Sequence, residues 1–182
     1  MSSINETILE VDENNEPIGV ISKFDAHAEG VWHRTVHIYY IKKNKDGFNF
    51  LAHHRSKDKD LHPNSWDARF GGHVKYKQNI DDAVKCEMRE EIGISIKMED
   101  LIEGQVRRVV SQSKKNREFS YVFYYFGDED ETKLSFNEDE VEEVRWMTME
   151  EIQDEMIQEP DMWAGNLKEF DLICEELVKL SV

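Results

Sequence analysis

The segment from residue 71 to residue 94 constrains this chain more than any other part of its sequence. It begins with two glycines, Gly71 and Gly72, and continues into a stretch, 79–92, whose apolar residues have the spacing of a helix. Asn79 is suited to cap that helix at its first turn. The segment therefore predicts a glycine turn that leads into a capped helix.

Three carboxylates share one side of the predicted helix. Glu87, Glu90 and Glu91 stand at positions i, i+3 and i+4, which places their side chains about one turn apart on the same face. Carboxylates this close repel one another unless a cation lies between them, and Mg²⁺ prefers oxygen ligands. The opposite face carries the apolar residues Val84, Met88 and Ile92. The spacing predicts a divalent-metal site, and an exposed acidic face without metal is the simpler alternative.

Basic residues and bare backbone could complete a phosphate site beside this metal. Gly71 and Gly72 have no side chain, so a metal ion or a phosphate can approach their backbone closely. Arg55 and Lys59 lie in a polar loop and are candidates to hold a diphosphate, Arg55 by its fork and Lys59 as a point charge. A solvated basic loop is the alternative interpretation of these two residues.

The charge of the chain limits its partners. The 182 residues carry a net charge of −16, so most of the surface repels nucleic acids and anionic membranes. A polyanionic ligand can bind only where cations or a bound metal reverse the local field. We therefore expect a small-molecule diphosphate as partner, with no nucleic acid and no membrane, and the sequence leaves open whether the chain forms a homodimer.

The first residues and the cysteines predict a cytoplasmic location. The first ten residues have neither the basic nor the apolar region of a secretory signal. No apolar run approaches the ~20 residues that a membrane span needs. Cys86 and Cys174 are far apart and outside any CxxC motif, which is usual in a reducing compartment.

The alternation of short β-prone and helical stretches predicts an α+β fold. We expect one domain over residues 1–182, with an N-terminal hairpin at 6–22, a core from about 30 to 160, and a C-terminal helix at about 165–180. The strands expected within the core are 34–42, 48–53, 66–70, 105–110, 119–126 and 141–147.

The glycine and helix segment resembles a Nudix box, whose pattern is G-x5-E-x7-R-E-U-x-E-E-x-G-U with U apolar. The positions that match in register are Gly72, Glu87, Met88, Glu90, Glu91, Gly93 and Ile94. Gln78 stands where the pattern has its first Glu, and Cys86 stands where it has Arg. Both replacements are neutral, so neither leaves a charge without its partner. The resemblance implies an α/β/α sandwich with a mixed sheet, and Mg²⁺ or Mn²⁺ bound by Glu87, Glu90 and Glu91.

Roughly residues 6 to 165 also resemble the branch of Nudix proteins related to type I isopentenyl-diphosphate isomerase. The residues that carry this resemblance are Val11-Asp12-Glu13, Gly19, Ala26-His27, His33-Arg34, Arg55, Lys59, Pro63, Trp66, and the stretches 140–146 and 148–152. In the isomerases, two early histidines, a histidine after the central glycine and a late glutamate build a metal site. The resemblance places His27, His33, His73 and Glu118 in these roles.

Three functions follow from these resemblances. The first is a hydrolase that cleaves the diphosphate linkage of a small molecule, such as a nucleoside diphosphate derivative, with Glu90 or Glu118 as proton acceptor. The second is an isomerase-like enzyme. Gly71 argues against it, because the isomerases have a catalytic cysteine at that position. The third is a ligand-binding module without catalysis, suggested by Gln78 and Cys86.

Overall fold

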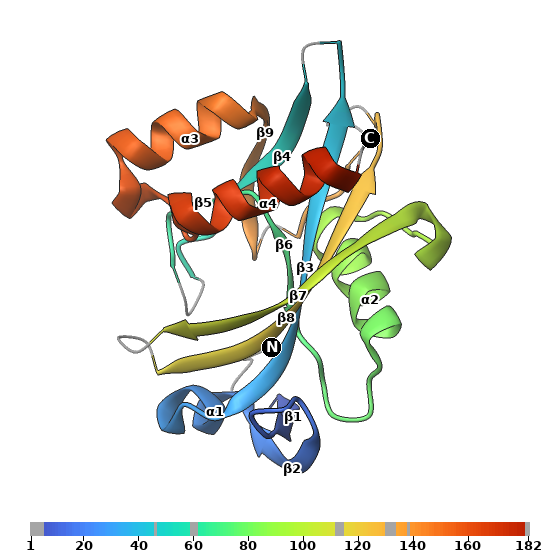
Figure 1. Cartoon of the computed structure of the whole chain (residues 1–182), viewed down its shortest axis with the longest axis vertical. Coiled ribbons are helices and arrows are strands. Elements are labelled where there is room, and N and C mark those ends of the chain that lie inside the picture. Colours follow the sequence, from blue (N-terminus) through green and yellow to red (C-terminus); the bar gives the residue numbers. More distant parts are fainter. Residues whose placement is uncertain are drawn as a thin grey trace.

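A long strand, β3 (Trp32–Lys43), is the axis of the fold in the computed structural model (Figure 1). It pairs in parallel with β8 (Asn116–Phe126) and antiparallel with β6 (Phe70–His73). Near its end it also pairs with β4 (Phe48–Arg55). The strands expected at 34–42 and 119–126 are confirmed and are longer than expected. The structure describes residues 6–45, 47–58, 62–111, 115–129, 134–137 and 139–180.

The other strands extend this mixed sheet on both sides. They are β1 (Thr7–Val11), β2 (Pro17–Ser22), β5 (Trp66–Asp67), β7 (Leu101–Ser111) and β9 (Val141–Thr148). The β1–β2 hairpin confirms the expected N-terminal hairpin, and β1 meets β3 where Glu10 pairs with His33. Strand β7 pairs with β8, and β9 pairs with β4, both antiparallel.

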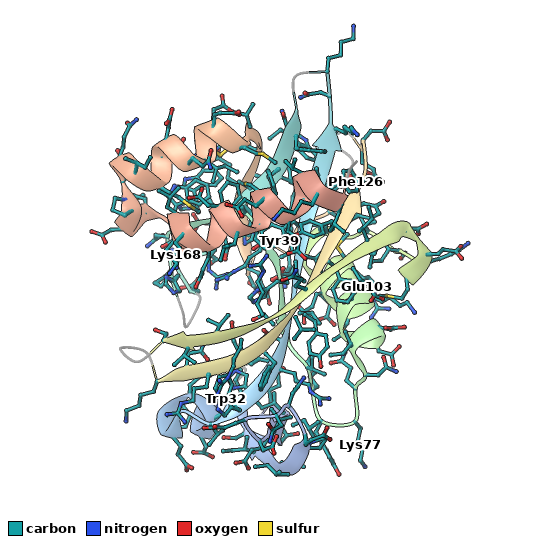
Figure 2. The ribbon with its side chains drawn as sticks, in the orientation of Figure 1. Trp32, Tyr39, Lys77, Glu103, Phe126 and Lys168 are labelled. Atoms are coloured by element: carbon teal, nitrogen blue, oxygen red, sulfur yellow. The ribbon has the colours of Figure 1, made fainter. Side chains whose placement is uncertain are left out.

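Helices cover both faces of the sheet, as expected for an α/β/α sandwich. On one face, α2 (Ile80–Ile92) packs against Val36 and Ile38 of β3. On the other face, α3 (Met149–Gln158) and α4 (Leu167–Leu180) pack over Tyr39 and its neighbours, as Figures 1 and 2 show. The apolar side chains of β3 contribute to both faces of the sheet because successive side chains of a strand point to opposite sides.

Helix α2 forms as its sequence predicts. The side chain of Asn79 accepts a hydrogen bond from the backbone N–H of Asp82, and the helix ends at Gly93. Val84, Met88 and Ile92 are fully buried. The apolar face therefore anchors the helix to the sheet and leaves the acidic side turned toward β6 and solvent.

Two details differ from the sequence-based expectation. The strand expected at 66–70 is broken at Ala68 because the Asp67 carboxylate accepts the N–H of Arg69 and bends the chain, which resumes as β6. A short helix, α1 (Lys23–Glu29), was not expected. Its seven residues are too few for a clear helical period, although Ser22 caps it.

Some of the connections between these elements are 3₁₀ turns. Among the residues that the structure describes, 3₁₀ turns lie at Met98–Asp100 and Pro160–Met162. Within the described ranges, no helix has both the length and the apolar character needed to cross a membrane. Lys59, a candidate substrate-binding residue, lies outside the described residues. The single-domain organisation stays a prediction.

Candidate functional site

Strand β6 is where the predicted site residues meet. Its residues Gly71, Gly72 and His73 pair with His37, Val36 and Thr35 of β3, respectively. Gly72 faces α2, since a Cβ built on it would lie 2.7 Å from the Glu87 carboxylate. His73, one residue further along the strand, points to the opposite face. The acids and the histidines therefore approach the same short strand from opposite sides.

The three predicted acids occupy different positions around β6. The buried carboxylate of Glu91 accepts the backbone N–H of Gly71 at 2.8 Å. Glu87 is half-buried against Gly72. Glu90 is exposed and accepts a hydrogen bond from the Cys86 thiol at 3.0 Å. In the part of the chain that the structure describes, these acids do not form a group whose ligand atoms all lie within 4.8 Å.

The surroundings of Glu87 favour its protonated form when no metal is bound. Burial, together with the negative charges of Glu140 and Glu90, raises the pKa of Glu87 to about 7, although Lys75 opposes the rise. Burial by itself would lower the pKa of Lys75, but Glu6 and the carboxylates of α2 raise it. A divalent cation would relieve the repulsion between these acids more fully than one lysine does.

The neutral residue at the first Glu position of the box keeps a structural role. The side-chain oxygen of Gln78 accepts the backbone N–H of Lys75 at 3.0 Å and closes the loop before α2. A carboxylate would offer the same acceptor atom. The replacement of Glu by Gln78 therefore leaves the loop braced.

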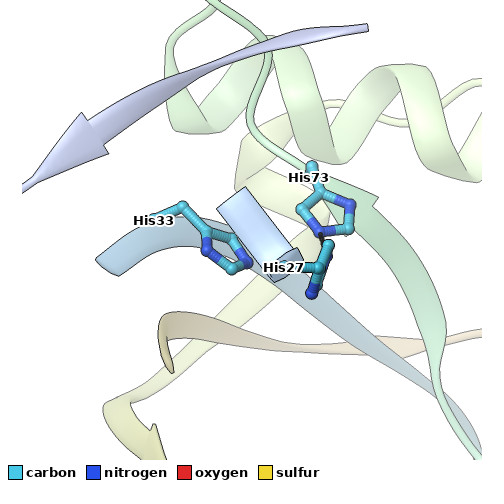
Figure 3. Close-up of side chains that lie close together, drawn as sticks. All are labelled: His27, His33 and His73. Atoms are coloured by element: carbon cyan, nitrogen blue, oxygen red, sulfur yellow. Dashed lines mark hydrogen bonds between the residues drawn. The ribbon is translucent and has the colours of Figure 1, made fainter. Parts of the chain in front are cut away.

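Three histidines from separate elements converge into one cluster (Figure 3). The ligand nitrogens of His27 in α1, His33 in β3 and His73 in β6 all lie within 4.8 Å of one another. The Nε2 atoms of His27 and His73 are 2.9 Å apart. Burial lowers the pKa of each imidazole, which keeps the rings neutral and their lone pairs available at neutral pH.

His33 provides the observation that tests whether this cluster fits a metal. Its Nδ1 lies 3.0 Å from the carbonyl oxygen of Val31, and donation of a proton there leaves a lone pair on Nε2. Nε2 is buried and has no hydrogen-bond partner in the described ranges. An orphaned ring nitrogen that faces two other imidazoles fits a transition-metal ion such as Zn²⁺.

Glu118 lies beside the histidine cluster, as the isomerase resemblance implies. Its carboxylate is 3.9 Å from His33 Nε2 and 3.7 Å from His37 Nε2. Asn116 and Ser120 each donate a hydrogen bond to it. Burial alone would raise the pKa of Glu118, but His37, Arg69, His33 and the hydrogen bond from Asn116 lower it. The carboxylate is therefore ionised at neutral pH.

A pocket of about 190 Å³ opens next to this cluster and is smaller than the ~300–1,000 Å³ typical of drug-sized ligand sites. Gly71, Gly72 and Arg55, all predicted to bind substrate, line it, as do His27, His73 and Glu118. The other lining residues are Thr35, His37, His62, Asp67, Arg69, Phe70, Asn116 and Ala164. None of the three box acids, Glu87, Glu90 and Glu91, is among the lining residues.

Asp67 and Arg69 are the charged pocket residues that the sequence patterns did not indicate. The available signal was a pair of charged residues, two positions apart, in a stretch that otherwise looks like a strand entering Gly71. Charged residues at the end of a buried strand are unusual unless they are paired. Their pairing with each other shows why they are tolerated there.

The backbone at Gly71 bears on the isomerase alternative. Its φ of +142° lies in a region that residues with side chains rarely adopt, and a Cβ there would overlap the carbonyl oxygen of Val36. A cysteine at position 71 therefore has no room unless the backbone changes. The isomerase-like mechanism thus lacks both the thiol and a place for it.

Comparison with known proteins identifies the family. The model of the NUDIX domain matches residues 31–168. The chain belongs to the Nudix family. A Nudix hydrolase of Clostridium acetobutylicum, itself uncharacterized, is 30% identical over 141 residues, which cover 76% of this chain and 68% of that protein. An isopentenyl-diphosphate Delta-isomerase of Photorhabdus laumondii is 26% identical over 181 residues, which cover 93% and 99% of the two chains.

A solved structure supports the fold of this Nudix protein. A Deinococcus radiodurans protein superimposes with a TM-score of 0.73 at 23% identity, covering 93% of this chain and 99% of that one. This likeness confirms the predicted α+β sandwich. The metal and substrate roles of individual residues in the Nudix protein stay predictions.

Proposed function

We propose that this Nudix protein is a divalent-metal-dependent hydrolase that cleaves the diphosphate linkage of a small molecule. One observation carries the proposal: the box acids Glu87 and Glu91 are held against Gly71 and Gly72, and the same two glycines line a pocket. Only the backbone of β6 at Gly71 and Gly72 would separate a diphosphate in this pocket from the box acids, because neither glycine has a side chain.

Two kinds of metal ligand are available around β6. The oxygens of Glu87, Glu90 and Glu91 suit Mg²⁺ or Mn²⁺, whereas imidazoles of the kind that cluster at His73 suit a softer ion such as Zn²⁺. When bound, such cations would neutralise the charge that develops on the phosphoryl oxygens and help to ionise the attacking water.

The chain's own residues would orient the substrate and accept a proton. Arg55 lines the pocket and would hold the phosphate that does not react. Of the two candidate proton acceptors, Glu118 lines the pocket and is ionised, whereas Glu90 is exposed outside its lining. We therefore assign proton acceptance to Glu118 in the proposed reaction.

An isomerase-like activity is the second candidate. The cluster of His27, His33 and His73 beside Glu118 favours it, since the isomerase resemblance implies that same set. The backbone at Gly71 opposes it, because no thiol fits there. Hydrolysis needs no thiol and is therefore the function that the geometry supports best.

The proposal is tested with a panel of nucleotide, sugar and prenyl diphosphates in the presence of Mg²⁺ or Mn²⁺. We expect metal-dependent release of monophosphate products, and we expect Glu91→Gln to lower kcat by about 100-fold or more, because the cation that would neutralise the charge of the transition state loses a ligand. Glu175→Gln, on the exposed side of α4, is the matched control and should leave kcat unchanged.

Other outcomes would favour the other functions. Migration of the double bond in isopentenyl diphosphate would support the isomerase. Tight diphosphate binding without turnover, retained in Glu87→Ala and Glu91→Ala, would support a binding module and would contradict the hydrolase.

A further inference from the structure

Arg69 is a second arginine in the candidate pocket, and it lies outside the Nudix box. It lies in the bend between β5 and β6, two residues before Gly71. Arg55 reaches the same pocket from the end of β4. Two guanidinium groups therefore converge from separate elements on a cavity lined by the glycines of the box.

One buried carboxylate holds both arginines. Asp67 is 5% exposed, and its Oδ2 atom is 3.3 Å from Arg69 Nε and 3.9 Å from Arg55 Nη1. Its Oδ1 atom accepts the backbone N–H of Arg69 at 3.1 Å. Arg55 Nε donates to the carbonyl oxygen of His62. Both guanidinium groups are thus fixed before any ligand arrives, which lowers the entropy cost of binding.

The end of the Arg69 side chain remains available. Its Nε is used by Asp67, but no described residue accepts a hydrogen bond from its Nη groups. In the described ranges, neither Nη atom of Arg69 is a buried donor without a partner, and the side chain is 27% exposed. Arg69 therefore lines the pocket with Nη donors that no described residue uses, in the planar arrangement that matches phosphate oxygens.

The charges of the pocket suit a phosphate. The positive charges of Arg55 and Arg69 are balanced by the negative charges of Asp67 and Glu118. The pocket is therefore close to neutral without a metal, and a divalent cation at the histidine cluster would make it positive by about two charges. A doubly charged terminal phosphate has the complementary charge.

We propose that Arg69 and Arg55, held together by Asp67, bind the terminal phosphate of the substrate, so that the substrate class is a diphosphate with an unesterified end. The inference rests on the proposed function and specifies its substrate. The cavity of about 190 Å³ supports it, because so small a space suits a terminal phosphate better than a phosphate esterified to a second organic group.

Calorimetric binding of inorganic pyrophosphate with Mg²⁺ and Zn²⁺ present tests the role of Arg69 apart from turnover. We expect Arg69→Gln to weaken binding by about 10- to 100-fold, as the loss of charged hydrogen bonds does. Arg69→Lys should be intermediate, because it keeps the charge but not the fork. Arg108→Gln removes the same charge from a half-exposed side chain outside the pocket and should bind as the wild type does.

A purely structural role for Arg69 gives a different result. If Arg69 only neutralised Asp67, Arg69→Gln would lower the melting temperature while the folded variant still bound pyrophosphate like the wild type. That result, or an absence of pyrophosphate binding by the wild type, overturns the inference. Weakened binding by Arg69→Gln in a protein that turns over no diphosphate would instead leave the inference standing and refute the hydrolase.

Competition tests the substrate class. ADP, which has a free terminal phosphate, should displace pyrophosphate at about 10-fold lower concentration than ADP-ribose, in which both phosphates are esterified. Arg69→Gln should remove this difference. Equal competition by the two ligands against the wild type would contradict the assignment of the terminal phosphate to Arg69.

Discussion

Glu87 lies against Gly72, and its raised pKa couples its protonation to the metal binding that we propose for it. Burial and neighbouring carboxylates raise its pKa from 4.5 to about 7. Between these two values the folded protein holds a proton that the unfolded chain has released. The contribution of Glu87 to stability is therefore largest at low pH and falls as the pH rises through this range.

Replacement of Glu87 by glutamine removes this titration. In the presence of EDTA, Glu87→Gln should gain free energy of unfolding relative to the wild type as the pH rises from about 5 to about 8. Urea unfolding measures the difference at each pH. Glu175→Gln, an exposed change on α4, should follow the wild type. Parallel pH profiles for Glu87→Gln and the wild type would show that the pKa of Glu87 is not raised.

Metal binding at the same residue should compete with its proton. Because a ligand carboxylate must be ionised, Mg²⁺ should raise the melting temperature more at about pH 8 than at about pH 6. Thermal unfolding with and without Mg²⁺ measures this difference. Glu87→Gln should reduce the Mg²⁺ effect at both pH values, and an undiminished effect in that variant would place the Mg²⁺ elsewhere.

At the scale of elements, α2 carries the box acids and depends on its first turn. The side chain of Asn79 accepts the N–H of Asp82, one of the backbone groups that a helix cannot satisfy by itself. Asn79→Ala should therefore lower the free energy of unfolding by about 1 kcal/mol, measured in urea. Asn79→Asp keeps an acceptor and should remain near the wild type. A cost as large for Asp as for Ala would exclude the cap as the cause.

Several elements could be predicted from sequence because their signals are local. Asn79, the apolar face of α2 and Gly93 define that helix within one short segment. Thr148 and Glu151 form the reciprocal cap of α3 in the same way. Helix α1 and the break between β5 and β6 were missed, because the first is short and the second depends on one hydrogen bond of Asp67.

At the scale of the whole molecule, α4 closes the face of the sheet that is opposite α2. Glu176 of α4 is the link, since its carboxylate accepts hydrogen bonds from Arg107 Nη2 at 2.5 Å and from Tyr124 at 3.1 Å. It also accepts the backbone N–H of Gln105. These contacts tie the C-terminal helix to the β7–β8 hairpin that also carries Glu118.

Removal of the Glu176 contacts should destabilise the packing of α4 on the sheet. Glu176→Ala leaves Arg107 without its carboxylate and should lower the free energy of unfolding by about 2 kcal/mol. Glu175→Ala, one residue away and exposed, should change it by less than about 0.5 kcal/mol. Urea unfolding of the two variants makes the comparison, and equal costs would show that α4 is held by its apolar face alone.

The sequence by itself determined the α+β class, helix α2 with its acids, and the resemblance to the Nudix box, because each depends on spacing within a short stretch. Only the tertiary structure decided which residues form the pocket. His33 of β3 approaches His73 of β6 because these two strands pair, and Asp67 reaches Arg55 because β5 pairs with β4. Local periodicity defines the faces of an element, whereas contacts between distant residues depend on the order in which the strands pair.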